Sequence, residues 1–164
     1  MLPVYPATTT GNCTVPGSTA DQDPETITTE VQKMLAASPM PNAEEWAIHD
    51  YEGFYGCVLS EWEGFEQVSA LASFLAEQGN LRAELVTHFG GDLDDASQAL
   101  EENYCGEYKS LADFAEELTS ETVTIPTQLV YYIDYEAMAR DMELNGDVFT
   151  VELGYECVHI FWNR

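Results

Sequence analysis

The sequence predicts an α+β fold in which a central group of helices is flanked by two segments that mix sheet and helix. Hydrophobic residues recur at helical spacing between positions 65 and 100. Segments with strand-like alternation lie on either side, at 46–50 and 148–162. Hydrophobic residues make up 45% of the 164 positions, which is enough to build a core in spite of a formal net charge of −25. We therefore expect a folded protein rather than a disordered polyanion.

The first two thirds of the chain are expected to begin with a short strand at residues 1–5, followed by a loop rich in Thr, Pro and Gly. A helix is predicted from Asp23, because Asp caps a helix and Pro24 suits its first position. Pro39 and Pro41 are expected to end it. Three further helices are predicted from their hydrophobic stripes: Phe65, Val68, Leu71, Ala72 and Leu75; Leu81, Leu85 and Phe89; and Leu93, Ala96 and Leu100.

The last third begins with a predicted strand at 104–108, and Ser110 with Asp113 then resembles a capping box. Pro126 is expected to open a short helical turn, and Asp134 to cap a helix that ends at Asn145-Gly146. Residues 148–153 and 157–162 read as a hairpin around Gly154. The inner faces of the two helices are expected to be Leu111, Phe114, Ala115 and Leu118, and Tyr135, Met138, Ala139 and Met142.

The charge is far larger than solubility requires, with 30 Asp and Glu against 5 Lys and Arg. The excess predicts a strongly positive partner. Direct nucleic-acid binding is disfavoured, because it needs a cluster of Lys and Arg. Duplex DNA carries one negative charge per about 1.7 Å of axis, so 25 charges match about 43 Å of duplex.

The acidic residues are concentrated after position 42 and lie on outward faces of the predicted helices. On the helix after Ser110 they stand three or four residues apart with no Lys or Arg between them, although like charges at this spacing destabilise a helix. Glu101 and Glu102 lie near the end of a helix, where its dipole disfavours negative charge. We therefore predict a functional acidic surface made of Glu61, Glu63, Glu66, Glu77, Glu84, Asp92, Asp94, Asp95, Glu101, Glu102, Asp113, Glu116, Glu117 and Glu121.

Two other interpretations use the same carboxylates. A calcium loop starting at Asp92 would need Gly at the sixth position and Glu at the twelfth, and neither is present. Hydrolysis by paired carboxylates would need two acids in one cleft, and thirty acids make that signal unspecific.

Nucleophilic catalysis has no motif to support it. His49, His88 and His159 lie on different predicted elements, and His159 is expected to have no special role. The sequence therefore predicts no enzyme, no cofactor and no metal. The three tryptophans are expected to be core residues: Trp46, Trp62 and Trp162.

Four widely spaced cysteines, Cys13, Cys57, Cys105 and Cys157, are expected to be free thiols in a reducing cytoplasm. The first residues do not resemble a signal peptide, and no apolar run is long enough to span a membrane.

Several blocks resemble ArdA-type antirestriction proteins. They are N-A-E-E-W-A-I-H-D-Y-E-G at 42–53, the stretch around Cys105-Gly106-Glu107-Tyr108, the helix at 111–118, and Y-I-D-Y-E-A-M-A-R-D-M-E-L-N-G at 132–146, preceded by Ile125-Pro126. The resemblance covers roughly residues 24–162. Residues 6–19 depart from the family pattern, so the resemblance does not predict whether the first domain contains the family's sheet.

The resemblance implies a DNA mimic, made by mobile elements such as conjugative plasmids and transposons, that occupies the DNA-binding groove of type I restriction–modification enzymes. It also implies an elongated homodimer of three small domains, here 1–53, 54–103 and 104–164, joined through the last. The antirestriction motif would include Pro126, Tyr132, Asp134, Tyr135, Arg140 and Asp141. Tyr132 and Tyr135 are expected to pack in the core or the dimer, and Arg140 to pair with Glu136. The alternative is an acidic adaptor or chaperone for another basic protein.

Overall fold

The computed structural model describes residues 3–7, 18–19, 23–37 and 46–163. Helices and short antiparallel sheets alternate along the chain, so the predicted α+β class is confirmed. The chain divides into two compact units, residues 1–93 and 94–164. The finer division into three domains stays a prediction.

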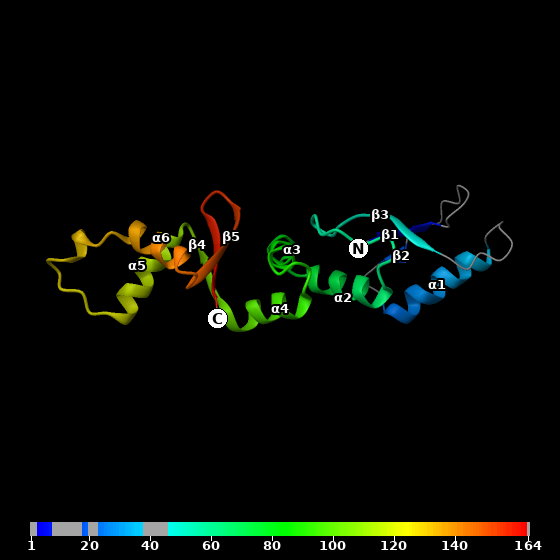
Figure 1. Ribbon diagram of the computed structural model, residues 1–164, viewed down its shortest axis with the longest axis horizontal. Helices are drawn as coiled ribbons and strands as arrows, with labels where there is room; N and C mark the ends of the chain where they lie inside the picture. The colour runs from blue at the N-terminus through cyan, green and yellow to red at the C-terminus, as the bar shows by residue number, and fades with distance from the viewer. Residues whose placement is uncertain (1–2, 8–17, 20–22, 38–45, 164) are drawn as a thin grey trace. The chain divides into compact units, whose positions relative to one another are not determined.

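Unit 1 contains a three-stranded antiparallel sheet in the order β2-β1-β3. Its strands are β1 (Pro3–Ala7), β2 (Ser18–Thr19) and β3 (Ala47–Tyr51). The strands expected at 1–5 and 46–50 are therefore present as β1 and β3, whereas β2 lies in a stretch that was expected to be loop. The sheet is formed although the sequence departs there from the family pattern. Helices α1 (Pro24–Ala36) and α2 (Phe65–Leu75) lie beside this sheet (Figure 1).

Helix α1 begins as its sequence predicts. The backbone N–H of Glu25 donates to the Asp23 carboxylate at 3.1 Å, and Pro24 occupies the first turn. Its inner face packs around Trp46 and Phe65, whose rings stack with centroids 4.1 Å apart. That inner face consists of Ile27, Val31 and Met34. Pro39 and Pro41, predicted to end the helix, lie outside the described residues.

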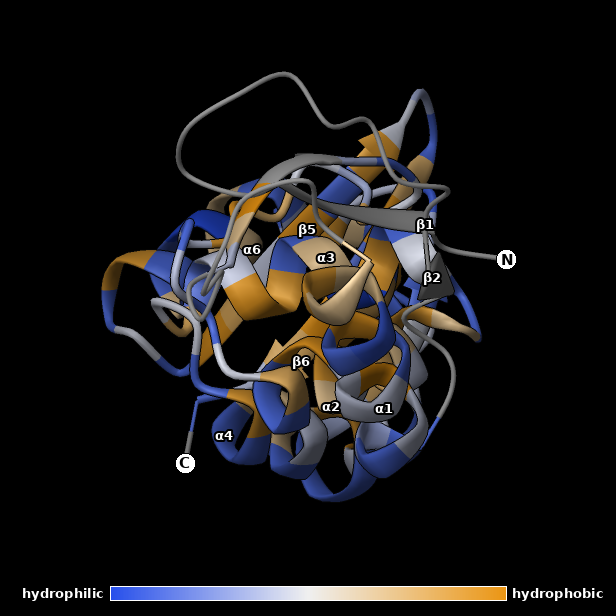
Figure 2. Cartoon of the chain, turned by 90° about the vertical axis from the view of Figure 1, so that its right-hand side faces the viewer, coloured by the Kyte–Doolittle hydropathy of each residue, from blue (hydrophilic) through white to orange (hydrophobic). Residues whose placement is uncertain are grey.

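The remaining helices of this region follow their hydrophobic stripes. They are α2, α3 (Gly79–His88) and α4 (Leu93–Gln98), and the last continues into a π-helical turn, η1 (Ala99–Asn103). Hydrophobic and hydrophilic residues alternate along the helices, as the orange and blue colouring in Figure 2 shows. No helix in the described part of the chain combines the length and the apolar composition needed to cross a bilayer. The most deeply buried positions include Val68, Leu75, Leu81 and Leu85.

Unit 2 is built on a second three-stranded antiparallel sheet, in the order β4-β6-β5. Its strands are β4 (Tyr104–Tyr108), β5 (Val148–Gly154) and β6 (Cys157–Trp162). Helices α5 (Leu111–Thr122) and α6 (Tyr135–Leu144) lie together to one side of this sheet (Figure 1). The core between the sheet and these helices consists of Phe114, Val148, Val158 and Ile160.

Three details differ from the sequence prediction. Met138 is 40% exposed, because α6 meets α5 along one edge, where Thr119 Oγ1 contacts the Met138 sulfur at 3.4 Å. Trp62 is 57% exposed, because the buried positions of the loop before α2 are occupied by Phe54, Cys57 and Leu59. Residues 127–129 form a turn after Pro126, and the helical turn itself, η2 (Val130–Tyr132), begins later.

Candidate interaction surface

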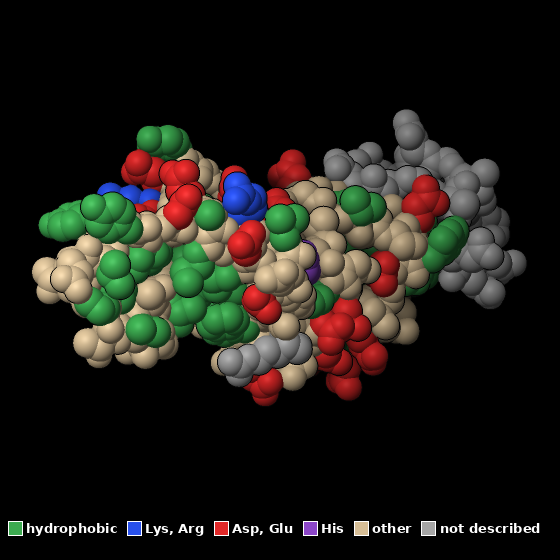
Figure 3. Space-filling view, turned by 60° about the vertical axis from the view of Figure 1, so that its left-hand side comes forward, with side chains coloured by type: hydrophobic (Ala, Val, Ile, Leu, Met, Phe, Trp, Pro, Cys, Tyr) green, Lys and Arg blue, Asp and Glu red, His purple; other side chains and the backbone are tan. Residues whose placement is uncertain are grey.

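The predicted acidic surface is accessible. Thirteen of its fourteen carboxylates are exposed, and Glu63 is half-buried. Six of them lie in unit 1 and eight in unit 2. In the space-filling view, red carboxylates are more prominent than blue Lys and Arg side chains, and green hydrophobic side chains are most abundant in the left half of the view (Figure 3).

Helix α5 carries the clearest acidic row. Phe114 and Ala115 are buried, whereas the four acids stand on the outer side. Ser110 caps the helix: it accepts from the Asp113 N–H at 3.2 Å and donates to the Asp113 carboxylate at 2.5 Å. The four acids of the row are Asp113, Glu116, Glu117 and Glu121. Ser110 is therefore confirmed as the N-cap, whereas the Asp113 carboxylate accepts from the Ser110 hydroxyl in place of the backbone N–H that a full capping box uses.

Glu117 is held by a neutral donor. The Tyr108 hydroxyl donates to Glu117 Oε1 at 2.9 Å, from the neighbouring strand β4. Partial burial and this hydrogen bond raise the pKa of Tyr108 to about 12, so the phenol stays protonated at neutral pH. The carboxylate is thus positioned while its negative charge is kept.

The acids around α4 and η1 are also accommodated locally, by the helix dipole or by neutral hydrogen-bond donors. Asp94 and Asp95 lie in the first turn of α4, where the helix dipole favours them. From the end of α4, Gln98 Nε2 donates to Glu102 Oε2 of η1 at 2.9 Å, and Ser97 Oγ donates to Glu101 Oε1 of η1 at 3.5 Å. Neutral amide and hydroxyl groups orient these two carboxylates without cancelling their charge.

Glu77 is the exception among the predicted carboxylates. Its Oε2 lies 3.1 Å from an Arg82 guanidinium nitrogen. Arg82 is itself fixed, because it donates to the Phe74 carbonyl at 2.8 Å and lies 5.0 Å from the centre of the Phe74 ring. The negative charge of Glu77 is therefore partly cancelled.

The motif region predicted between Pro126 and Asp141 has a different character. Residues 123–134 loop away from the sheet of their own unit (yellow in Figure 1) and expose hydrophobic side chains. Tyr132 is 84% exposed, so it does not pack in the core of this chain, whereas Tyr135 is half-buried. Among the described ion pairs, Arg140 and Glu136 form none, so that predicted pair is wrong.

The remaining motif residues have local roles. Asp134 caps α6 by accepting from the Ala137 N–H at 2.9 Å, as the sequence predicts. Pro126 precedes the turn that leads to η2, where the Leu129 N–H donates to the Pro126 carbonyl at 2.8 Å. Arg140 and Asp141 are exposed on α6. Sequence reasoning missed the neighbouring Tyr131, which is 91% exposed.

Sequence reasoning also missed a polar cluster on the second sheet. His159, which was given no special role, is buried and lies beside Tyr104, Cys157 and Glu107. Burial lowers the pKa of His159, against the opposing effect of Glu107. Partial burial and the Glu107 carboxylate raise the pKa of the Cys157 thiol. Cys57, Cys105 and Cys157 take part in no disulfide.

A family model described as "Antirestriction protein (ArdA)" matches residues 16–157. The matched range includes every predicted acidic position and the whole segment from Pro126 to Asp141. It agrees with the resemblance seen in the sequence. The comparison with curated proteins finds no match.

Proposed function

The chain belongs to the ArdA family of antirestriction proteins, and on that basis we propose that it acts as a DNA mimic. In this proposal its carboxylates occupy the DNA-binding groove of a type I restriction–modification enzyme and compete with DNA for it. A groove that binds DNA is lined with Lys and Arg side chains that contact backbone phosphates. Carboxylates can form the same charge-assisted hydrogen bonds with those side chains.

One observation supports this proposal most strongly: several carboxylates are positioned by neutral donors. Tyr108 holds Glu117, Gln98 holds Glu102 and Ser110 holds Asp113. A surface built for stability alone would use Lys or Arg at such places, because an opposite charge relieves repulsion. Neutral donors leave the charge available for a cationic partner.

Fixed carboxylates also favour binding for an entropic reason. Each flexible side chain that becomes ordered in an interface costs about 0.5–1.5 kcal/mol. Side chains already held by hydrogen bonds in the free protein lose less freedom on binding. The arrangement therefore suits a surface that must match a groove shaped for a stiff double helix.

The direct test is displacement of fluorescently labelled duplex DNA from a purified type I enzyme, followed by anisotropy. We expect the chain to displace DNA, and its inhibition constant to rise as salt increases from about 50 to about 200 mM. Inhibition that does not respond to salt would contradict charge matching. A pull-down that recovers other basic proteins but no restriction subunit would favour the acidic adaptor instead.

A variant with Asp113→Asn, Glu116→Gln and Glu117→Gln tests the row on α5. Each exposed charge pair contributes about 0.2–1 kcal/mol, so we expect inhibition to weaken by about 3-fold to about 160-fold. The matched control changes Asp147 to Asn and both Glu152 and Glu156 to Gln, which removes the same charge from exposed positions of the same unit outside the predicted acidic surface and the motif region. Equal losses in both variants would indicate that total charge matters and position does not.

We also propose that the chain forms a homodimer through unit 2. The support is the exposed hydrophobic loop, in which Tyr131 and Tyr132 are 91% and 84% exposed. Exposed hydrophobic groups of this size often mark an interface between proteins. Light scattering after size exclusion should give twice the chain mass, and a variant with both tyrosines changed to Ser should approach the monomer mass. A monomer in the unchanged protein would contradict this proposal.

A further inference from the structure

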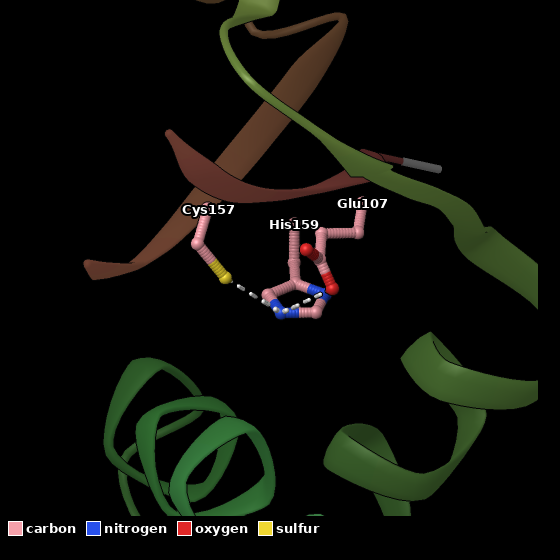
Figure 4. A group of neighbouring side chains, drawn as sticks. All are labelled: Glu107, Cys157 and His159. Atoms are coloured by element: carbon pink, nitrogen blue, oxygen red, sulfur yellow. Dashed lines mark hydrogen bonds and ion pairs between the residues drawn. The ribbon is translucent and has the colours of Figure 1, made fainter. Parts of the chain in front are cut away.

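The second sheet brings together three side chains of the kind that bind transition metals. Cys157 and His159 lie two residues apart on β6, so they project from the same face. Glu107 on β4 pairs directly with His159 in the register of the sheet. One ligand atom from each residue lies within 4.8 Å of the others, as Figure 4 shows.

A bulge in β4 produces this convergence. The register shifts between Tyr104 and Gly106, and Gly106 has a φ of +135°, which residues with a side chain rarely adopt. The extra residue places Tyr104 and Glu107 beside His159, whereas Cys105 and Tyr108 pack against the core on the helix side. Without the bulge, simple alternation would put Tyr104 and Glu107 on opposite faces.

The distances between the ligand atoms are close to those expected for ligands arranged tetrahedrally around a metal ion. His159 Nε2 lies 3.8 Å from Cys157 Sγ and 4.0 Å from Glu107 Oε2. Ligands of zinc, at about 2.0–2.1 Å for nitrogen and oxygen and about 2.3 Å for sulfur, stand about 3.6 Å (N to S) and about 3.4 Å (N to O) apart at tetrahedral angles. The N-to-S separation is therefore about 0.2 Å and the N-to-O separation about 0.6 Å wider than around a bound zinc ion. The thiol and the carboxylate lie within 4.8 Å of each other, so rotation of side chains, chiefly of the exposed Glu107, has to close the set. The observed separations are too wide for strong hydrogen bonds.

The histidine ring is also oriented as in metal sites. Its Nδ1 lies 2.8 Å from the Tyr104 hydroxyl. When Nδ1–H donates to that oxygen, Nε2 keeps a lone pair that faces the thiol and the carboxylate. Metal-binding histidines commonly use the second nitrogen in this way. Glu107 is 58% exposed, so an ion can reach the site from solvent.

We propose that Glu107, Cys157 and His159 bind one Zn²⁺ ion, with a solvent molecule as the fourth ligand. Zinc suits a set of one nitrogen, one sulfur and one oxygen donor. The ion joins β4 to β6. It stabilises unit 2, because the three ligands come together only in the folded chain and the ion therefore binds the folded state alone. The site does not depend on the proposed inhibition of restriction enzymes.

The test uses Co²⁺ as a spectroscopic probe in the full chain after treatment with a chelator. A thiolate ligand gives a sulfur-to-cobalt absorption band in the near ultraviolet. We expect one equivalent of Co²⁺ to produce the band, Zn²⁺ to abolish it, and Zn²⁺ to raise the melting temperature. If Co²⁺ binds only to surface carboxylates, no such band appears, and that result would overturn the proposal.

Three variants locate the site. Cys157→Ser should remove the band, and Cys105→Ser, a thiol on the same sheet that packs toward the helices, should keep it. Tyr104→Phe keeps all three ligands and should weaken Zn²⁺ binding by about 10- to 100-fold. Glu107→Gln, at an exposed position, should weaken binding without unfolding the sheet, which circular dichroism checks. Equal loss of the band in Cys105→Ser and Cys157→Ser would refute the assignment.

Discussion

Removing charge from the acidic row of α5 should stabilise the protein while it weakens inhibition. The informative variant changes Glu116 and Glu121 to Gln. It leaves Asp113 at the cap and Glu117 on the Tyr108 hydroxyl, so no described hydrogen bond is lost. Helix propensity barely changes, because Glu and Gln are nearly equal formers.

The magnitude follows from the positions of the charges. The variant removes two like-charge contacts, Asp113 with Glu116 and Glu117 with Glu121, each worth about 0.2–0.5 kcal/mol. Glu121 also lies in the last turn of α5, where an anion costs about 0.3–1 kcal/mol. The sum is about 0.7–2 kcal/mol, which corresponds to about 3–16 °C in the melting temperature of a unit of this size.

Differential scanning calorimetry at low salt and at about 1 M salt measures the effect. At high salt the screening length falls to about 3 Å, so the stabilisation should shrink. The control Glu152→Gln with Glu156→Gln removes the same charge from the hairpin of the same unit, outside the acidic row of α5, and should stabilise less. A variant that melts at or below the temperature of the unchanged protein at low salt would refute the idea that this row costs stability.

Two other predictions concern the same unit. Ser110→Ala should lower stability by about 0.5–2 kcal/mol, because it removes the cap of α5, and chemical unfolding would detect it; an unchanged midpoint would contradict the capping role. Tyr108, with its pKa raised to about 12, should hold its proton in the folded state after unfolded tyrosine has lost it, so stability should fall as pH rises from about 10 to about 12. The loss should be smaller in Tyr108→Phe, and an equal loss in both proteins would show that another group is responsible.

The sequence predicts the helices well because their signals are local. Asp23, Ser110 and Asp134 each cap the helix for which they were proposed, and each bond joins residues two or three apart. Hydrophobic spacing likewise identifies Val68, Leu75 and Leu85 as core. The acidic positions are equally predictable, because exposure of a carboxylate needs no knowledge of distant partners.

Features that depend on backbone irregularity or on distant pairing are not predictable in this way. The π-helical turn continues α4 where a regular helix was expected. The cluster on β4 and β6 joins residues 107 and 159 through strand register, and the bulge at Gly106 decides which side chains face it. A Cys-x-His pair on a predicted strand is the local signal that was present, although it does not reveal the carboxylate opposite.

Glu77 offers a test of the mimicry at the level of a single residue. The argument for a functional surface depends on charge that stays uncancelled, and Arg82 partly cancels the charge of Glu77 at 3.1 Å. Glu77→Gln should therefore weaken DNA displacement less than Glu102→Gln, although both residues are exposed and both changes remove one charge. The Glu102 side chain is held by Gln98, a neutral donor, so its full charge is lost on substitution. If Glu77→Gln proves the more damaging change, the availability of charge does not govern binding, and the contact geometry of the Glu77–Arg82 pair has to be considered instead.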